Sequence, residues 1–390
     1  MRIRQVDVEG IQAHLESLDL DGWLIYDFHG TNPVAARVLG VGGMGTRRLF
    51  IWIPRTGTPV AVAHRIELQG LAGFPGETRP YARWSELHQH LRSLVRGKGI
   101  AVEISTEDAV PYLDRVPHGV VELLTALGAR VTSSGALVTR FAARVTQEEL
   151  AGHRQAAERL AAIARETLES VVRRPGEVQE VEVQASVLSA IRDAGLSTGH
   201  PPIVAFGPNA AIPHYEPGEG ANRTLRAGEV VLLDLWGGVG EPSVYADQTW
   251  MGFAGTEPPS DVDAVWIAVR DARESVVSHL EAAHAEGRSV SGADLDDVAR
   301  DLIEGRGYGE AFLHRTGHSI DVELHGCGPH LDNFETHDVR AIEPGIVFSV
   351  EPGVYLEGRF GVRSEIDVVM TESGPDPTPR SRQDRLILPG

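Results

Sequence analysis

Four acidic residues of this chain stand in sequence contexts that could do chemistry. Each of them follows or lies within an apolar run, and the four runs are EVVLLD, VYAD, VFSVE and GVRSEIDVVM. A carboxylate among apolar neighbours is costly unless it is paired, hydrogen-bonded or bound to a metal. This placement marks four carboxylates as candidate functional groups: Asp234, Asp247, Glu351 and Glu365.

Local spacing predicts how these carboxylates come together. The eight residues 237–244, between the first two runs, are rich in turn formers. We therefore expect the flanking strands to form a hairpin that brings Asp234 and Asp247 close to one another. In the last run, the strand period of two places Arg363, Glu365 and Asp367 on one face.

A histidine-rich segment, HRTGHSIDVELHG, lies between the second and third carboxylates and contains His314, His318 and His325. Four carboxylates and one imidazole form a hard, negatively charged site that suits two divalent cations with shared carboxylates. Such a pair of cations activates water and polarises a carbonyl, so hydrolysis is the expected chemistry. Mn²⁺ and Co²⁺ are expected ahead of Zn²⁺.

The first third of the chain has a different character from the part that carries these residues. Strand-like runs around 23–26, 48–53, 59–63 and 99–105 alternate with helical stretches near 87–96 and 112–127. This alternation predicts an N-terminal α/β domain, residues 1–137.

From Thr146 onward the pattern is that of a second domain. Thr146 and Glu149 form a capping box ahead of a long amphipathic helix. Further helices are expected at about 178–193, after a cap at Ser260, and at about 291–305, with short strands between and after them. We therefore predict an α+β domain, residues 138–390, which contains the four carboxylates and the three histidines.

Composition narrows the classes of function. The formal net charge of −19, from 36 basic and 55 acidic side chains, argues against a nucleic-acid partner. The single cysteine, Cys327, excludes an intramolecular disulfide and cysteine-rich zinc sites. No apolar run reaches the length of a membrane span, and the first residues have no apolar signal core. We therefore expect a soluble, cytoplasmic protein with no membrane partner.

Six segments, in order over about residues 200–370, resemble the pita-bread metallopeptidases, the family of prolidase, aminopeptidase P and methionine aminopeptidase. They are PHYEP, LLDLWG, YADQTW, TGHSIDVELHG, SVEPGVY and GVRSEID. The resemblance implies an α+β fold whose C-terminal catalytic domain is of the pita-bread (creatinase/aminopeptidase-like) type, with helices packed outside a curved antiparallel sheet. The N-terminal α/β domain resembles the creatinase-type domain of the Xaa-Pro branch.

The same resemblance implies a set of metal ligands. Asp234 would bind one metal ion, and His318 and Glu351 would bind the other. Asp247 and Glu365 would bridge both ions. Glu351 also resembles the general base of the family.

Four further positions match functional residues of the family. His214 resembles the proton shuttle to the leaving group, and His325 resembles the histidine that touches the substrate backbone. His314 and Arg363 match positions that contact the proline side of the substrate. The resemblance also implies a small peptide substrate with proline at its second position, and a homodimer.

The implied function is hydrolysis of an Xaa-Pro peptide bond. Dipeptides are favoured (prolidase activity), because Arg363 beside the metals could receive a free carboxylate. Removal of the first residue of longer peptides (aminopeptidase P activity) is the alternative. A metal-free hydrolase like creatinase and a non-catalytic binding module are disfavoured, because the chain keeps all five metal ligands.

Three positions depart from the family pattern around His318. Ser319 and Asp321 stand where the family has glycine, and Gly326 stands where an acidic residue is common. These departures leave the shape of the substrate pocket open.

Other polar residues of this region have structural interpretations. Arg363 could orient Glu365 through an ion pair instead of binding substrate. Cys327 is expected to be a packed small side chain. His330 and His337 are expected to be solvated loop residues.

Overall fold

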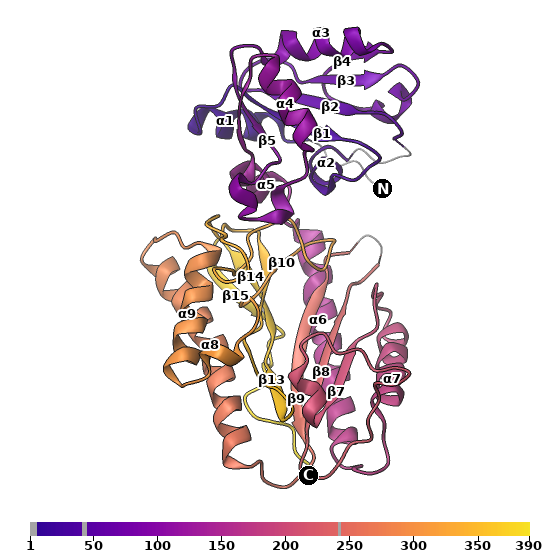
Figure 1. Cartoon of the computed structure of the whole chain (residues 1–390), viewed down its shortest axis with the longest axis vertical. Helices are drawn as coiled ribbons and strands as arrows, with labels where there is room; N and C mark the ends of the chain where they lie inside the picture. The colour runs from indigo at the N-terminus through magenta and orange to yellow at the C-terminus, as the bar shows by residue number, and fades with distance from the viewer. Residues whose placement is uncertain (1–5, 41–44, 241–242) are drawn as a thin grey trace. The chain divides into compact units, whose positions relative to one another are not determined.

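The computed structural model describes residues 6–40, 45–240 and 243–390 (Figure 1). The chain divides into two compact units, Met1–Ala143 and Arg144–Gly390. The domain boundary expected from the sequence, after residue 137, falls inside helix α5, Gly135–Phe141.

The first unit is built on a mixed six-stranded sheet of order β4-β3-β2-β1-β5-β6. Apolar strand residues such as Phe50 and Val62 pack in one core with Leu87 and Leu91 of an amphipathic helix. Besides α5, its main elements are α1 Val8–Ser17, β1 Gly22–Asp27, α2 Pro33–Leu39, β2 Leu49–Pro54, β3 Val60–His64, β4 Glu77–Tyr81, α3 Trp84–Val95, β5 Gly99–Val102, α4 His118–Ala126 and β6 Arg130–Ser133.

The second unit begins with α6, Gln147–Val171, whose capping box of Thr146 and Glu149 is confirmed. Its other helices are α7 Glu180–Asp193, α8 Ser260–Ala285 and α9 Gly292–Gly305. Ser260 is the first helical residue of α8 rather than its cap, and Pro259 takes the cap position.

Among the described residues of the second unit, nine strands lie between these helices. In Figure 1 they run between α6 and α7 on one side and α8 and α9 on the other. Within the described residues they pair in the orders β7-β8-β9, β10-β11-β14-β15 and β12-β13. The strands are β7 Ile203–Phe206, β8 Val230–Gly237, β9 Ala246–Phe253, β10 Ser319–Ile320, β11 Val347–Val350, β12 Gly353–Leu356, β13 Phe360–Arg363, β14 Ile366–Thr371 and β15 Gly374–Thr378.

Strands β8 and β9 form the antiparallel pair expected from the sequence, and every residue in both strands is buried. Asp234 lies opposite Thr249, and Asp247 lies opposite Trp236. Because opposite residues and residues two apart share a face, both aspartates point to the same side of the sheet. The hairpin therefore delivers two carboxylates to one place.

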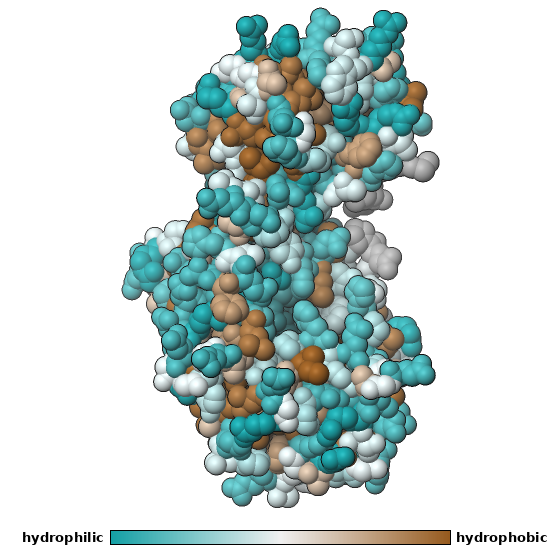
Figure 2. Space-filling view, viewed as in Figure 1, coloured by the Kyte–Doolittle hydropathy of each residue, from teal (hydrophilic) through white to brown (hydrophobic). Residues whose placement is uncertain are grey.

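The visible surface of the protein is mainly hydrophilic. Figure 2 shows scattered hydrophobic patches on a mainly hydrophilic visible face. Among the residues that the structure describes, no helix is both long and apolar enough to cross a bilayer.

Candidate metal centre

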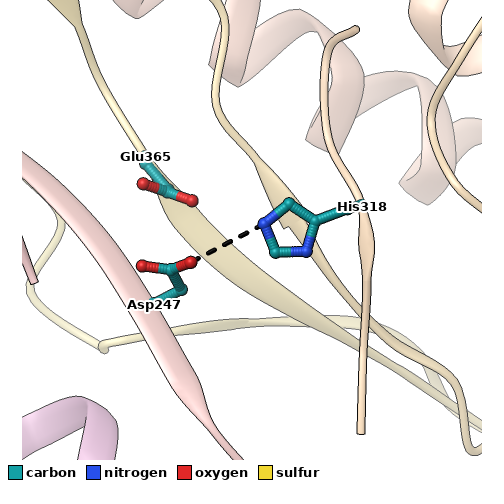
Figure 3. A group of neighbouring side chains, drawn as sticks. All are labelled: Asp247, His318 and Glu365. Carbon is teal, nitrogen blue, oxygen red and sulfur yellow. Dashed lines mark ion pairs between the residues drawn. The ribbon is translucent and has the colours of Figure 1, made fainter. Parts of the chain in front are cut away.

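Three buried side chains from separate segments converge on one point (Figure 3). Asp247 lies on β9, His318 directly precedes β10, and Glu365 lies between β13 and β14. One potential ligand atom from each lies within 4.8 Å of the other two. Only 3–4% of the surface of each residue is exposed. These residues come from both halves of the strand assembly, so their convergence depends on the fold of the whole unit.

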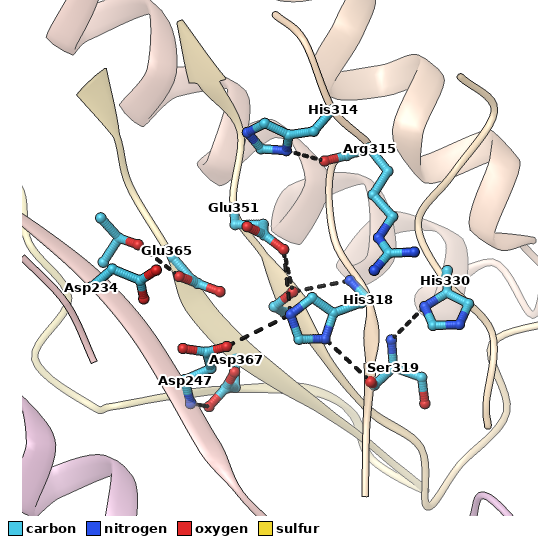
Figure 4. A network of polar contacts seen from close by, with 12 residues as sticks. Asp234, Asp247, His314, Arg315, His318, Ser319, His330, Glu351, Glu365 and Asp367 are labelled. Carbon is cyan, nitrogen blue, oxygen red and sulfur yellow. Dashed lines mark hydrogen bonds and ion pairs between the residues drawn. The ribbon is translucent and has the colours of Figure 1, made fainter. Parts of the chain in front are cut away.

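The other two predicted ligands lie in the same pocket (Figure 4). Glu351 follows β11, and its Oε1 atom is 3.4 Å from Nε2 of His318. Nε2 of His318 is also 3.6 Å from Oδ2 of Asp247. Asp234 of β8 lies beside Glu365 in the close-up view. The structure thus brings together all five side chains that the sequence marked as metal ligands.

The hydrogen bonding of His318 suits a metal ligand. Its Nδ1 atom lies 3.2 Å from the carbonyl oxygen of Ser319, so Nδ1 carries the proton and donates. Nε2 then presents its lone pair towards Asp247 and Glu351. Burial, followed by the charge of His325, holds the pKa of His318 well below its ordinary value, so the ring is neutral. A neutral imidazole fixed in this way is the form that binds metals.

The carboxylates repel one another strongly. Burial, followed by the charges of Asp234, Asp367 and Glu351, raises the pKa of Asp247 well above its ordinary value. Burial and its acidic neighbours also raise the pKa of Glu365, and burial raises that of Glu351 to about 7. Divalent cations would remove this repulsion and keep the groups ionised.

Two oxygen atoms of the predicted metal ligands have unused bonding capacity. The Oδ1 atoms of Asp234 and Asp247 are buried and accept no hydrogen bond from any described residue. Buried carboxylate oxygens need hydrogen-bond donors or cations. The carboxylate oxygens and the imidazole of His318 form a set of metal ligands that fits hard or borderline divalent cations.

Arg363 and Thr249 hold two of the carboxylates in place. Arg363 forms an ion pair with Asp234, and its Nε atom donates to the hydroxyl of Thr249 over 2.8 Å. That hydroxyl donates to Oε2 of Glu365 over 2.7 Å. Arg363 therefore contacts Asp234 directly and reaches Glu365 through Thr249. Sequence reasoning missed Thr249, although its position two residues after Asp247 places it on the same face.

His314 joins this arrangement through Tyr355. Its Nδ1 atom donates to the carbonyl oxygen of Arg315 over 2.7 Å, so Nε2 accepts from the hydroxyl of Tyr355 over 2.8 Å. Nη1 of Arg363 lies 3.4 Å from the same hydroxyl. Burial, followed by the charge of Arg363, lowers the pKa of His314 to about 3. The two residues expected to contact the proline side of the substrate are thus linked by Tyr355, which the sequence analysis did not select.

The two remaining candidate histidines lie at the edge of the pocket. The ring of His325 is 4.2 Å from that of His318, with an angle of 60° between their planes. His214 is exposed and follows a short 3₁₀ helix, Gly207–Ala211. Burial raises the pKa of Asp234, and the charges of Arg363 and then His214 oppose that rise.

The surroundings of the pocket correct one expectation and show where Asp367 lies. His330 is fully buried, contrary to the solvated position expected for it, because residue 331 pairs with Gly317 and draws the loop inward. Its Nδ1 atom accepts from the backbone N–H of Ser319 over 3.2 Å. Asp367 is also fully buried, and it accepts from the backbone N–H of Asp247 over 2.9 Å.

Cys327 and His337 take the positions expected for them. Cys327 is buried, with 5% of its surface exposed, and His337 is exposed.

Residues 151–372, more than half of the chain, match the sequence pattern of Metallopeptidase family M24. The chain belongs to this family. It is 28% identical to a probable dipeptidase PepE of Mycobacterium tuberculosis over 342 residues, which cover 86% of this chain and 84% of that protein. It is 33% identical to an Xaa-Pro dipeptidase of Lactobacillus delbrueckii subsp. lactis over 224 residues, or 57% of this chain and 55% of that protein.

Solved structures of M24 peptidases confirm the expected fold. The crystal structure of dipeptidase PepE from Mycobacterium ulcerans matches with a TM-score of 0.74 and 26% identity, covering 98% of this chain and 96% of that one. This M24 peptidase therefore has the pita-bread catalytic fold together with an N-terminal α/β unit, and it is a metallopeptidase as its sequence segments implied.

Proposed function

We propose that this M24 peptidase binds two divalent cations through Asp234, Asp247, His318, Glu351 and Glu365, and hydrolyses Xaa-Pro dipeptides. The observation that carries the proposal is the convergence of these five side chains in one buried pocket beside Arg363. The likeness to a probable dipeptidase and to an Xaa-Pro dipeptidase supports the choice of substrate.

The residues of the pocket divide the chemistry among them. When bound, the cations supply Lewis acidity, which activates water and polarises a peptide carbonyl. Glu351 takes the proton of the attacking water. The hydroxyl of Ser349 donates to Oε1 of Glu351 over 3.1 Å and so orients the carboxylate. His214 returns a proton to the proline nitrogen as that nitrogen leaves. His325 donates a hydrogen bond to the substrate backbone.

Arg363 supports a preference for dipeptides. A guanidinium group has five N–H donors, and contacts with described residues use four of them: with Thr249, Pro213, Tyr355 and Asp234. The remaining donor, on Nη2, would receive the free carboxylate of the proline. Both ring nitrogens of His314 are already bonded, to the carbonyl oxygen of Arg315 and to the hydroxyl of Tyr355, so His314 offers that carboxylate no donor. A longer peptide has no carboxylate at this point, so it would leave the cationic group poorly matched.

The proposal extends to the metal, the cell compartment and the assembly. The oxygen-rich ligand set supports Mn²⁺ or Co²⁺ ahead of Zn²⁺. The single cysteine is consistent with a reducing cytoplasm. A homodimer follows from the family resemblance. Metal analysis of protein purified from cells tests the choice of metal, and sedimentation velocity tests the homodimer.

Kinetics with matched peptides test the proposed function. The metal-stripped protein is inactive in this scheme, and added Mn²⁺ or Co²⁺ restores it. A Leu-Pro dipeptide is then cleaved, whereas Leu-Ala is not. Higher kcat/KM for Leu-Pro-Ala than for Leu-Pro would move the assignment to aminopeptidase P, and full activity after complete metal removal would reject the metal centre.

We predict that the substitution Arg363→Lys separates substrate binding from metal binding. Lysine keeps a positive charge beside Asp234 but loses the planar fork that matches a carboxylate. KM for Leu-Pro should rise by about tenfold or more, a loss of about 1.4 kcal/mol in binding, while metal content stays at the wild-type value. Equal losses for Leu-Pro and Leu-Pro-Ala would show that Arg363 does not read the free carboxylate.

A further inference from the structure

A tightly bonded loop presents His325 to the metal centre. The backbone N–H of Gly326 donates to the carbonyl oxygen of Ser319 over 2.7 Å. Beyond His325, Arg340 donates to the carbonyl oxygens of Cys327 and Gly328 over 2.7 and 2.6 Å. The residues that follow His325 are therefore hydrogen-bonded both to Ser319 and to Arg340.

The carboxylate of Asp321 lies inside this loop and joins its two limbs. Its Oδ1 atom accepts from the backbone N–H of Glu323 over 2.8 Å. Its Oδ2 atom accepts from the backbone N–H of Cys327 over 3.1 Å and from the thiol of that residue over 3.4 Å. Asp321 is 2% exposed, so these donors replace the water that a carboxylate would otherwise bind. The side chain acts as an internal brace around His325.

Gly326 leaves the space that this carboxylate occupies. A Cβ atom at position 326 would lie 2.8 Å from both Cγ and Oδ2 of Asp321, closer than carbon atoms and carboxylate groups approach in proteins. Asp321 cannot swing away without losing its bonds to Glu323 and Cys327. Two of the three positions that depart from the family pattern, Asp321 and Gly326, are thus physically coupled.

We propose that Asp321 is a positioning residue, which braces the loop so that His325 lies against His318, and that Gly326 is the glycine this brace requires. The inference rests on the proposed function, in which His325 contacts the substrate backbone. The ring separation of 4.2 Å between His325 and His318 is the geometry that the brace preserves.

A double-mutant cycle tests whether Asp321 acts through His325. Asp321→Asn keeps the size of the side chain but replaces an acceptor with a donor facing the N–H of Cys327. Since a displacement of about 1 Å can cost up to about 100-fold in rate, we expect kcat/KM for Leu-Pro to fall by about 10- to 100-fold. In the His325→Ala background the same substitution should have no further effect, and metal content should equal that of the wild type throughout.

A second cycle tests the coupling to Gly326 by thermal unfolding, without reference to activity. Gly326→Ala should lower the unfolding midpoint of the full chain, and it should lower it by less in an Asp321→Gly background, where only the contact at 3.0 Å with the backbone nitrogen of residue 321 remains. Gly152→Ala, at a glycine inside α6 with open space around it, is the control for the added methyl group and should not lower the midpoint, because alanine favours a helix more than glycine does. Simple additivity of Asp321→Gly and Gly326→Ala would overturn the steric coupling.

The outcomes separate this inference from the proposed function. A wild type that hydrolyses no Xaa-Pro peptide contradicts the proposed function, and the positioning role with it. If the wild type is active but Asp321→Asn lowers kcat/KM by the same factor in the wild type and in His325→Ala, the positioning role is contradicted and the proposed function is not.

Discussion

Thr249 has one hydroxyl between two groups of opposite charge. The hydroxyl accepts from Arg363 and donates to Glu365, so its proton has a fixed direction. Thr249→Val should leave both groups unsatisfied and lower the free energy of unfolding by about 1–3 kcal/mol. Thr249→Ser keeps the hydroxyl and is the control. Chemical denaturation with metal analysis makes the comparison, and equal behaviour of the two variants would contradict this role.

The proposed ligands and the proton shuttle should respond differently to substitution. Asp247→Asn removes a charge from the point where three ligand atoms meet, so it should lower both metal content and turnover. His214→Ala should keep the metal and lower kcat by about 10²–10⁴-fold, the usual contribution of proton transfer. Metal content and kcat are measured on the same preparations. Metal loss in His214→Ala, with both ions retained in Asp247→Asn, would reverse these assignments.

The sequence allowed some residues of the pocket to be selected and concealed others. Asp234 and Asp247 stood out because a carboxylate within a buried strand requires a partner. Thr249 and Tyr355 did not, because threonine and tyrosine are ordinary strand residues. The pairing of Arg363 with Asp234 joins strands that are distant in the chain, so local periodicity pointed to Glu365 instead.

At the scale of elements, the start of α6 depends on its cap. The Thr146 hydroxyl accepts from the backbone N–H of Glu149 over 3.2 Å. The side chain of Glu149 accepts from the backbone N–H of Thr146 over 2.7 Å. Thr146→Ala should therefore lower the free energy of unfolding by about 1 kcal/mol, whereas Thr146→Ser should not. Urea unfolding measures the difference. No loss in the alanine variant would mean that packing alone fixes the start of α6.

Long elements with a clear pattern were predicted well, and short or edge elements were not. The helix α6 and strands β8 and β9 follow from regular burial over many residues. Strand β4 was missed because four of its five residues are not buried, which leaves no alternation to detect. The helix expected near 112–127 begins only at His118.

At the scale of the whole molecule, the first unit contains a pH-sensitive group of its own. Glu103 is fully buried and accepts from the indole N–H of Trp23 over 2.6 Å and from Asn32 over 3.1 Å. Burial raises its pKa from 4.5 to about 7. The folded state therefore binds a proton that the unfolded state has already released between these pH values.

Stability should fall as pH rises through this interval. Below pH 4.5 both states are protonated, and above about pH 7 both are ionised, so the loss occurs between the two values and amounts to about 3 kcal/mol. Glu103→Gln should remove this part of the pH dependence. Urea unfolding of the two proteins from pH 4 to 8 tests it, and parallel profiles would rule out Glu103 as the source.

The order of the proposed ligands along the chain has a consequence for biosynthesis. Asp234 leaves the ribosome first and Glu365 last, 131 residues later (365 − 234). Until Glu365 has emerged, a growing chain lacks one of the three side chains whose ligand atoms converge. If the proposed ligands hold the metal ions, we expect nascent chains to be inert towards neighbouring peptides until the segment joining β13 and β14 has been synthesised and folded into place.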